Sequence, residues 1–110
     1  MYLKEIIASI DADTRKKAEK LMKSESFMSL QDFDDGYEAF IASTDGFLLP
    51  QIVFAHDYTI LEYECQCRKR NGEDFCIHLA AMLLGIEKML EAGCFDYHEA
   101  VQKLEQNNIQ

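Results

Sequence analysis

The chain lacks the long apolar run that a membrane-spanning helix needs, because no stretch approaches 18 consecutive apolar residues. Its first ten residues carry Lys4 and Glu5 within an amphipathic pattern, which does not fit a secretory signal peptide. The 110 residues are 48% hydrophobic, enough for one buried core and too few for two. We therefore expect a single domain over residues 1–110, located in the cytoplasm, with no membrane association.

Positive charge is also scarce, and the net charge is −9. Residues 24–64 contain nine acidic side chains and no Lys or Arg. Seven of the eleven basic residues gather in two small groups, Arg15–Lys20 and Arg68–Arg70. A protein that grips nucleic acid unaided usually presents a basic face. The distribution therefore favours a protein partner with a basic surface over strong, independent DNA binding.

Cysteine is used sparingly, and three of the four cysteines gather around one histidine. Cys65 and Cys67 form C-x-C, and Cys76 and His78 form C-x-H after a gap of eight residues. Three thiols and an imidazole make a complete Cys3His ligand set for one tetrahedral Zn²⁺. Because protein side chains fill all four positions, the spacing predicts a structural zinc, one per chain. A catalytic zinc would keep one position open.

Other interpretations of this cluster are an iron–sulfur cluster with one histidine ligand, or three buried reduced cysteines beside a surface histidine. A redox dithiol fits less well, because C-x-C is not the C-x-x-C motif. Zinc with three thiolates carries a net charge of −1, which Arg68, Lys69 and Arg70 can offset. The same three residues are candidates for contact with nucleic acid or with a partner. Cys94, His56 and His98 are expected to be ordinary free or surface residues rather than ligands.

The geometry of regular structure restricts where the four ligands can lie. In a strand, residues i and i+2 point to the same side, so Cys65 and Cys67 at a strand end can face one metal. On a helix, residues i and i+2 lie about 200° apart. Cys76 must therefore lie at or before a helix start, with His78 in the first turn. Asp74 or Glu73 is a candidate to accept the second ring N–H of His78.

Apolar spacing and turn residues predict an α+β fold. We expect a small antiparallel β-meander, followed by a zinc knuckle and a helix, and flanked by N- and C-terminal helices. The N-terminal part, 1–36, holds one bent helix or two helices, the second capped by Asp11 or Asp13, and then a loop over 24–36. The middle part, 37–90, holds the strands, the knuckle and a broad apolar helix. The expected strands are 37–43, 47–54 and 58–64, and Pro50 makes the second either an edge strand or a strand with a break.

Turn and capping residues also set the ends of the last elements. Asp45-Gly46 is a hairpin signal between the first two expected strands. Gly93 is expected to end the apolar helix. Asp96 with Glu99 resembles a capping box, which predicts a C-terminal helix within residues 94–110.

The motif resembles the SWIM zinc finger, whose pattern is C-x-C followed by C-x-H and an apolar helix. The similarity covers roughly residues 37–90, and the apolar stretch here is Cys76-Ile77-His78-Leu79-Ala80 onward. Where the family usually has Cys-Lys-His, this chain has Ile77 in the middle. The resemblance implies a zinc-stabilised module that binds DNA or proteins, similar to the finger region at the N-terminus of bacterial SWI2/SNF2-type proteins.

Three classes of function follow from these features. The leading hypothesis is a structural-zinc interaction module that docks protein partners in a DNA-associated complex, such as an SNF2-type ATPase or the rest of a longer chain. The alternative is a nucleic-acid-binding adaptor that uses Arg68, Lys69 and Arg70. The sequence shows no P-loop and no Ser-His-Asp set, so we expect that the chain is not an enzyme.

Overall fold

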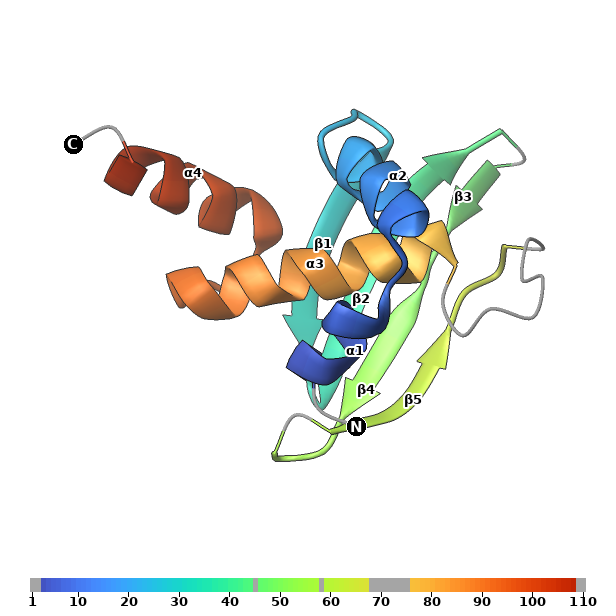
Figure 1. Cartoon of the computed structure of the whole chain (residues 1–110), viewed down its shortest axis with the longest axis horizontal. Coiled ribbons are helices and arrows are strands. Elements are labelled where there is room, and N and C mark those ends of the chain that lie inside the picture. The colour runs from blue at the N-terminus through green and yellow to red at the C-terminus, as the bar shows by residue number, and fades with distance from the viewer. Residues whose placement is uncertain (1–2, 45, 58, 68–75, 109–110) are drawn as a thin grey trace.

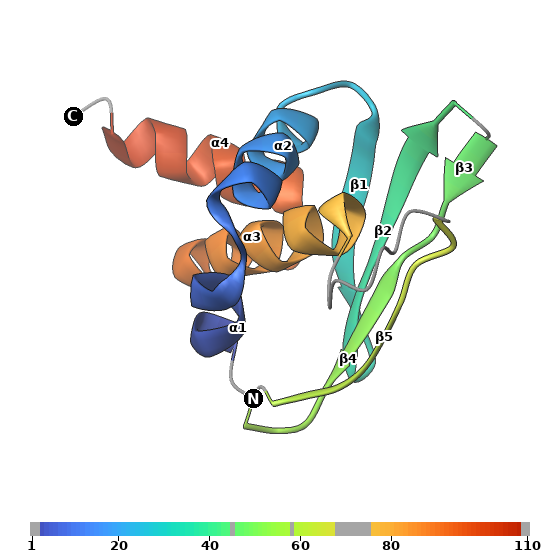
Figure 2. The same ribbon diagram turned by 45° about the vertical axis from the view of Figure 1, so that its right-hand side comes forward.

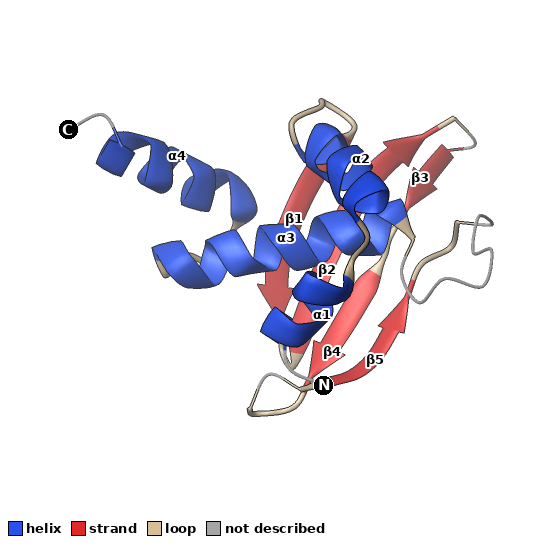
Figure 3. Cartoon of the chain, viewed as in Figure 1, coloured by secondary structure: helices blue, strands red, loops and turns tan. Residues whose placement is uncertain are grey.

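A computed structural model describes residues 3–44, 46–57, 59–67 and 76–108. An antiparallel sheet forms one layer, and the helices gather on one face of it (Figures 1 and 2). Figure 3 shows the same division by secondary structure. The α+β class that the sequence predicts is therefore confirmed. Among the helices in these ranges, none is both long and apolar enough to cross a membrane.

The N-terminal segment forms two separate helices, α1 (Leu3–Ser9) and α2 (Ala12–Met22). Asp11 is the N-cap of α2, and its Oδ1 accepts a hydrogen bond of 2.9 Å from the Thr14 N–H. A capping carboxylate satisfies a backbone donor that the helix leaves unpaired. The cap explains why the chain divides here instead of continuing as one bent helix.

The sheet is a meander in which every pair of neighbouring strands is antiparallel. The described strands are β1 (Phe27–Phe33), β2 (Gly36–Ser43), β3 (Gly46–Leu48), β4 (Gln51–Phe54) and β5 (Ile60–Glu64). Their order is β1-β2-β4-β5, and β3 pairs with β2. β3 and β4 thus follow each other along one edge of β2, interrupted at Leu49–Pro50. Of the two forms predicted for residues 47–54, the strand with a break is the one observed. The β2–β3 hairpin is also confirmed, although Asp45 of its predicted turn lies outside the described residues.

The prediction of a loop over residues 24–36 is wrong, because most of this segment is β1. Its pairing with β2 shifts register between Phe27 and Ser29. This bulge places the buried side chains of Phe27 and Leu30 three positions apart. A bulge adds a residue to one strand and so breaks the two-residue alternation by which a strand is recognised in sequence. The part expected to be helical, 1–36, therefore contributes a strand to the sheet.

The third helix, α3 (Ile77–Ala92), is the centre of the helical layer, because ten of its sixteen residues are buried. It ends at Gly93, whose φ of 69° is the left-handed conformation that glycine adopts readily. α4 (Tyr97–Asn108) follows, and the Oδ2 of Asp96 accepts a 3.1 Å hydrogen bond from the Glu99 N–H. Both the predicted stop at Gly93 and the predicted cap at Asp96 are confirmed.

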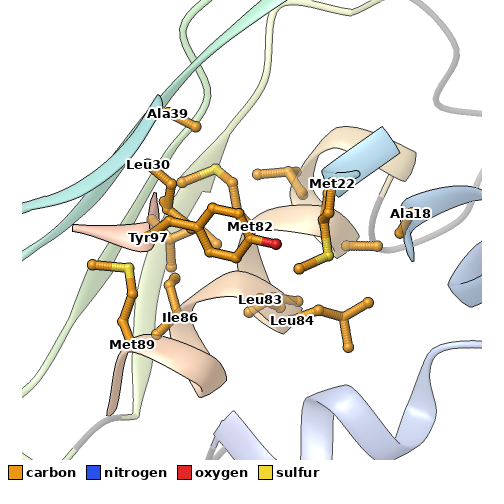
Figure 4. Packing of buried hydrophobic residues seen from close by; sticks show 14 of the residues in the cluster. Ala18, Met22, Leu30, Ala39, Met82, Leu83, Leu84, Ile86, Met89 and Tyr97 are labelled. Atoms are coloured by element: carbon orange, nitrogen blue, oxygen red, sulfur yellow. The ribbon is translucent and has the colours of Figure 1, made fainter. Parts of the chain in front are cut away.

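The core lies between α3 and the sheet, and it also receives side chains from α1, α2 and α4 (Figure 4). At its centre the rings of Phe27 and Tyr97 meet edge to face, with centroids 5.3 Å apart. α3 crosses β1 closely at Gly85, where an added Cβ would lie 2.5 Å from Leu30 Cδ2. α3 therefore has a fixed position over the sheet, and its first turn is held near the end of β5.

Candidate metal centre

The first two candidate ligands, Cys65 and Cys67, follow directly after β5. Pairing with β4 carries β5 as far as Glu64, opposite Gln51. The Cys65 side chain is buried, and that of Cys67 is partly buried. Both thiols therefore lie near the start of α3. Their i, i+2 spacing predicts that they point to the same side.

The second pair lies at the start of α3, as the helix geometry requires. Cys76 is the N-cap, with an extended backbone (φ −76°, ψ 172°), and its sulfur accepts a 3.4 Å hydrogen bond from the Leu79 N–H. His78 lies in the first helical turn and is partly buried. On a continuous helix, the side chains of Cys76 and His78 would point in different directions. Because the backbone changes from extended to helical at Cys76, both side chains face the same side.

The four ligand atoms lie within 4.8 Å of one another, close enough to hold one metal ion. Ideal tetrahedral zinc with Zn–S bonds of about 2.3 Å has ligand atoms about 3.8 Å apart. Closing the observed cluster to that spacing requires movements of at most about 1 Å. The structure therefore brings together all four ligands that the sequence predicts.

His78 supplies an independent test of whether the site fits a metal. Its Nδ1 is buried and has no hydrogen-bond partner among the described residues. A buried polar atom left without a partner costs about 1–3 kcal/mol. Coordination to a metal at this nitrogen would satisfy it. The partners proposed for the other ring nitrogen, Asp74 and Glu73, lie outside the described residues.

The thiols of the cluster also interact with each other. A hydrogen bond between the side chains of Cys65 and Cys76 is the main cause that lowers the pKa of Cys76, and the same contact raises the pKa of Cys65. Burial opposes the shift of the Cys76 pKa, whereas the neighbouring His78 side chain and the hydrogen bond from the Leu79 N–H reinforce it. The N-terminus of a helix further favours a negative sulfur. Cys76 therefore ionises more readily than Cys65, and the thiolate is the form that binds metal.

Gln66, between the two cysteines, takes part in a contact that the sequence analysis missed. Its Oε1 accepts a 2.8 Å hydrogen bond from the Leu49 N–H, and its Nε2 donates to the Leu49 carbonyl at 3.2 Å. Continuing the β4–β5 register by two residues sets Gln66 opposite Leu49. The side-chain amide thus replaces the backbone pair that is lost where the strand breaks at Pro50. This contact fixes the C-x-C segment to the sheet.

The remaining candidates are separate from the cluster or cannot be placed. The basic residues Arg68, Lys69 and Arg70 lie outside the described residues. Cys94 is partly buried, and its sulfur lies 3.7 Å from the Ala92 carbonyl oxygen. A ring nitrogen of His98 lies 3.0 Å from the Met28 carbonyl oxygen, and His56 is exposed. Among the described residues, the metal cluster consists of the four predicted ligands alone.

Comparisons with protein-family models, with curated proteins and with solved structures gave no match to this chain. What can be said of its function therefore rests on the residues and their arrangement.

Proposed function

We propose that this chain is a zinc-stabilised interaction module of the SWIM type, which docks protein partners in a DNA-associated complex. One observation carries the proposal: Cys65, Cys67, Cys76 and His78 converge within 4.8 Å where a strand end meets a helix start. The order of ligands, C-x-C and then C-x-H opening an apolar helix, is the SWIM order. Thiolate and imidazole donors in a tetrahedral set are typical of zinc.

The proposed zinc is structural, and we infer that the chain acts without catalysis. With four protein ligands, the metal has no position for water or substrate. In this role, the ion would join the end of β5 to the first turn of α3. The helix that it would anchor is the most buried element of the described fold.

Protein docking is favoured over DNA binding by the charges that the structure places on the surface. The basic group on α2 is partly neutralised by acids of the same helix. Arg15 Nε lies 3.4 Å from Glu19 Oε1, and Lys17 Nζ lies 3.1 Å from Asp13 Oδ2. The sheet is built from the segment 24–64, which has no Lys or Arg. A phosphate backbone would meet repulsion over most of this layer.

We therefore expect weak DNA binding by the zinc-loaded chain. A fluorescence anisotropy titration with a short labelled duplex at physiological salt should give a Kd of about 10⁻⁴ M or weaker, the weak end of ordinary non-specific binding. The alternative, a nucleic-acid-binding adaptor that uses Arg68, Lys69 and Arg70, predicts tight DNA binding. Submicromolar binding that falls steeply with salt and is lost in an Arg68→Ala, Lys69→Ala, Arg70→Ala triple variant would put that alternative first.

A matched control distinguishes DNA contacts of the basic loop, residues 68–70, from those of the basic group on α2. An Arg15→Ala, Lys17→Ala double variant removes the same kind of charge from α2, where both residues are ion-paired. If DNA binding is weak and equally insensitive to both variants, neither group is a nucleic-acid site.

A further inference from the structure

The far end of α3 from Cys76 borders an open groove of about 750 Å³. Its walls are the β1–β2 turn, the end of β4 with the start of β5, and the link from α3 to α4. Both hairpin turns lie at the lower end of the sheet, and α3 runs across the sheet so that its last turn lies beyond the β1 edge (Figure 1). A groove of this size accommodates a few side chains of a bound peptide.

Large apolar side chains are exposed along this groove. Leu61, Leu90 and Phe95 line it, and they are 60%, 40% and 74% exposed. They are three of the seven large apolar side chains that are exposed in the described part of the chain. Behind them, the rings of Tyr37 and Phe54 also line the groove and meet edge to face, with centroids 5.8 Å apart. Exposed large apolar side chains that line one groove form a candidate surface for binding an apolar group.

The rim of the groove is acidic. Asp32, Asp34 and Asp35 border it from the β1–β2 hairpin. The described residues that line the groove include no Lys or Arg, and the segment that supplies both hairpins contains none. An apolar floor with a negative rim therefore complements a ligand that carries both apolar side chains and positive charge.

We propose that this groove docks a cationic peptide segment of a protein partner. An apolar anchor of that segment covers Leu61, Leu90 and Phe95, and its Lys or Arg side chains face Asp32, Asp34 and Asp35. This inference rests on the proposed docking function, and it names the docking site and the chemistry of the partner. Nucleic acid does not fit, because the three carboxylates repel phosphate. A second copy of this chain fits less well, because each copy carries a net charge of −9 and two copies repel each other.

The test uses the full zinc-loaded chain and a fluorescein-labelled amphipathic peptide built from Lys, Leu and Ala. One control peptide has Ser in place of Leu, and the other has Glu in place of Lys. We expect the first control to bind at least about tenfold more weakly, because the apolar anchor carries most of the affinity. The second should not bind, because its charge matches that of the rim. Equal binding of the parent and the Ser peptide would show attraction by charge alone and overturn the proposal.

Variants then locate the site. A Leu90→Ser, Phe95→Ser double variant and an Asp34→Asn, Asp35→Asn double variant should each weaken binding of the parent peptide at least about fivefold. Phe47→Ser is the matched control, because Phe47 is 63% exposed on β3 and does not line the groove. Circular dichroism and zinc content show that each variant is folded and loaded. Binding that survives both groove variants, or that is lost in Phe47→Ser, overturns the assignment.

Two further measurements distinguish a bound peptide from a second copy of the chain, and failure of the groove site from failure of the zinc module. Peptide binding should shift the backbone amide signals of Gly36 and Gly93, which line the groove, and leave that of Gly46 unchanged. If sedimentation shows a dimer that only the groove variants dissociate, the occupant is a second copy and the peptide proposal is wrong. If the folded, zinc-loaded chain does not bind the peptide, the proposed groove site is wrong, but the proposed zinc module is not affected. A folded chain without zinc contradicts the module itself.

Discussion

Removal of zinc by a chelator is expected to unfold at least residues 58–90, and a Cys76→Ser variant should lose the same structure. Structural zinc in small domains contributes about 10–16 kcal/mol of apparent binding free energy. In this chain it would tie the end of β5 to α3, whose ten buried residues join both layers of the core. Far-UV circular dichroism and thermal unfolding, before and after chelation, measure the effect. Helical signal from the N-terminal helices can persist without fixed packing.

The choice of serine makes the Cys76 variant specific for the metal. Cys76 is also the N-cap of α3, and serine is a preferred N-cap residue. A loss of stability in Cys76→Ser therefore reports the missing thiolate and not a missing cap. Cys94→Ser is the matched control, because Cys94 lies outside the cluster and should change stability little. A Cys76→Ser variant with unchanged thermal stability would contradict the structural role of the metal.

Gly36→Ala should be strongly damaging although it lies away from the metal centre, lowering the free energy of unfolding by about 3 kcal/mol, the upper end of the usual cost of overpacking. Gly36 pairs with Val53 in the β2–β4 ladder. A Cβ at this position would overlap the backbone oxygen of Ile52 and lie 2.9 Å from the Cα of Val53. Because backbone atoms cannot move aside by rotating a side chain, the two strands must separate. Denaturant unfolding of zinc-loaded protein measures the change.

Gly85→Ala is the matched control for this prediction. There the added Cβ would meet the Cδ2 of Leu30 at 2.5 Å and the ring of Tyr97 at 3.3 Å, both of which belong to side chains. Alanine also gains about 0.8–1.0 kcal/mol of helix propensity over glycine. We expect a clearly smaller loss than for Gly36→Ala. Equal losses would show that the strand contact at Gly36 is no tighter than ordinary core packing.

The four candidate ligands were predictable because metal chemistry restricts residue type and spacing more strongly than packing does. The position of Cys76 before the helix followed from the angle between residues i and i+2 on a helix. Gly93 and Asp96 were predictable for a similar reason, because a left-handed helix end and a helix cap each favour few residue types. In each case a local physical requirement is visible in a few consecutive residues.

The features that escaped prediction depend on contacts between distant segments. β1 was missed because its bulge removes the alternation that identifies a strand. The role of Gln66 depends on the break at Pro50, which lies sixteen residues away in the chain. The groove is assembled from two hairpins and the end of α3, and no one of these segments indicates it alone. Packing partners of this kind cannot be read from one sequence.

One zinc ion is expected to occupy the cluster of Cys65, Cys67, Cys76 and His78. Elemental analysis of purified, metal-replete protein tests it most directly, with a Cys76→Ser sample measured in parallel. We expect close to one zinc per chain in the parent protein and a large loss in the variant. A reduced, correctly folded parent protein that contains no metal would contradict it.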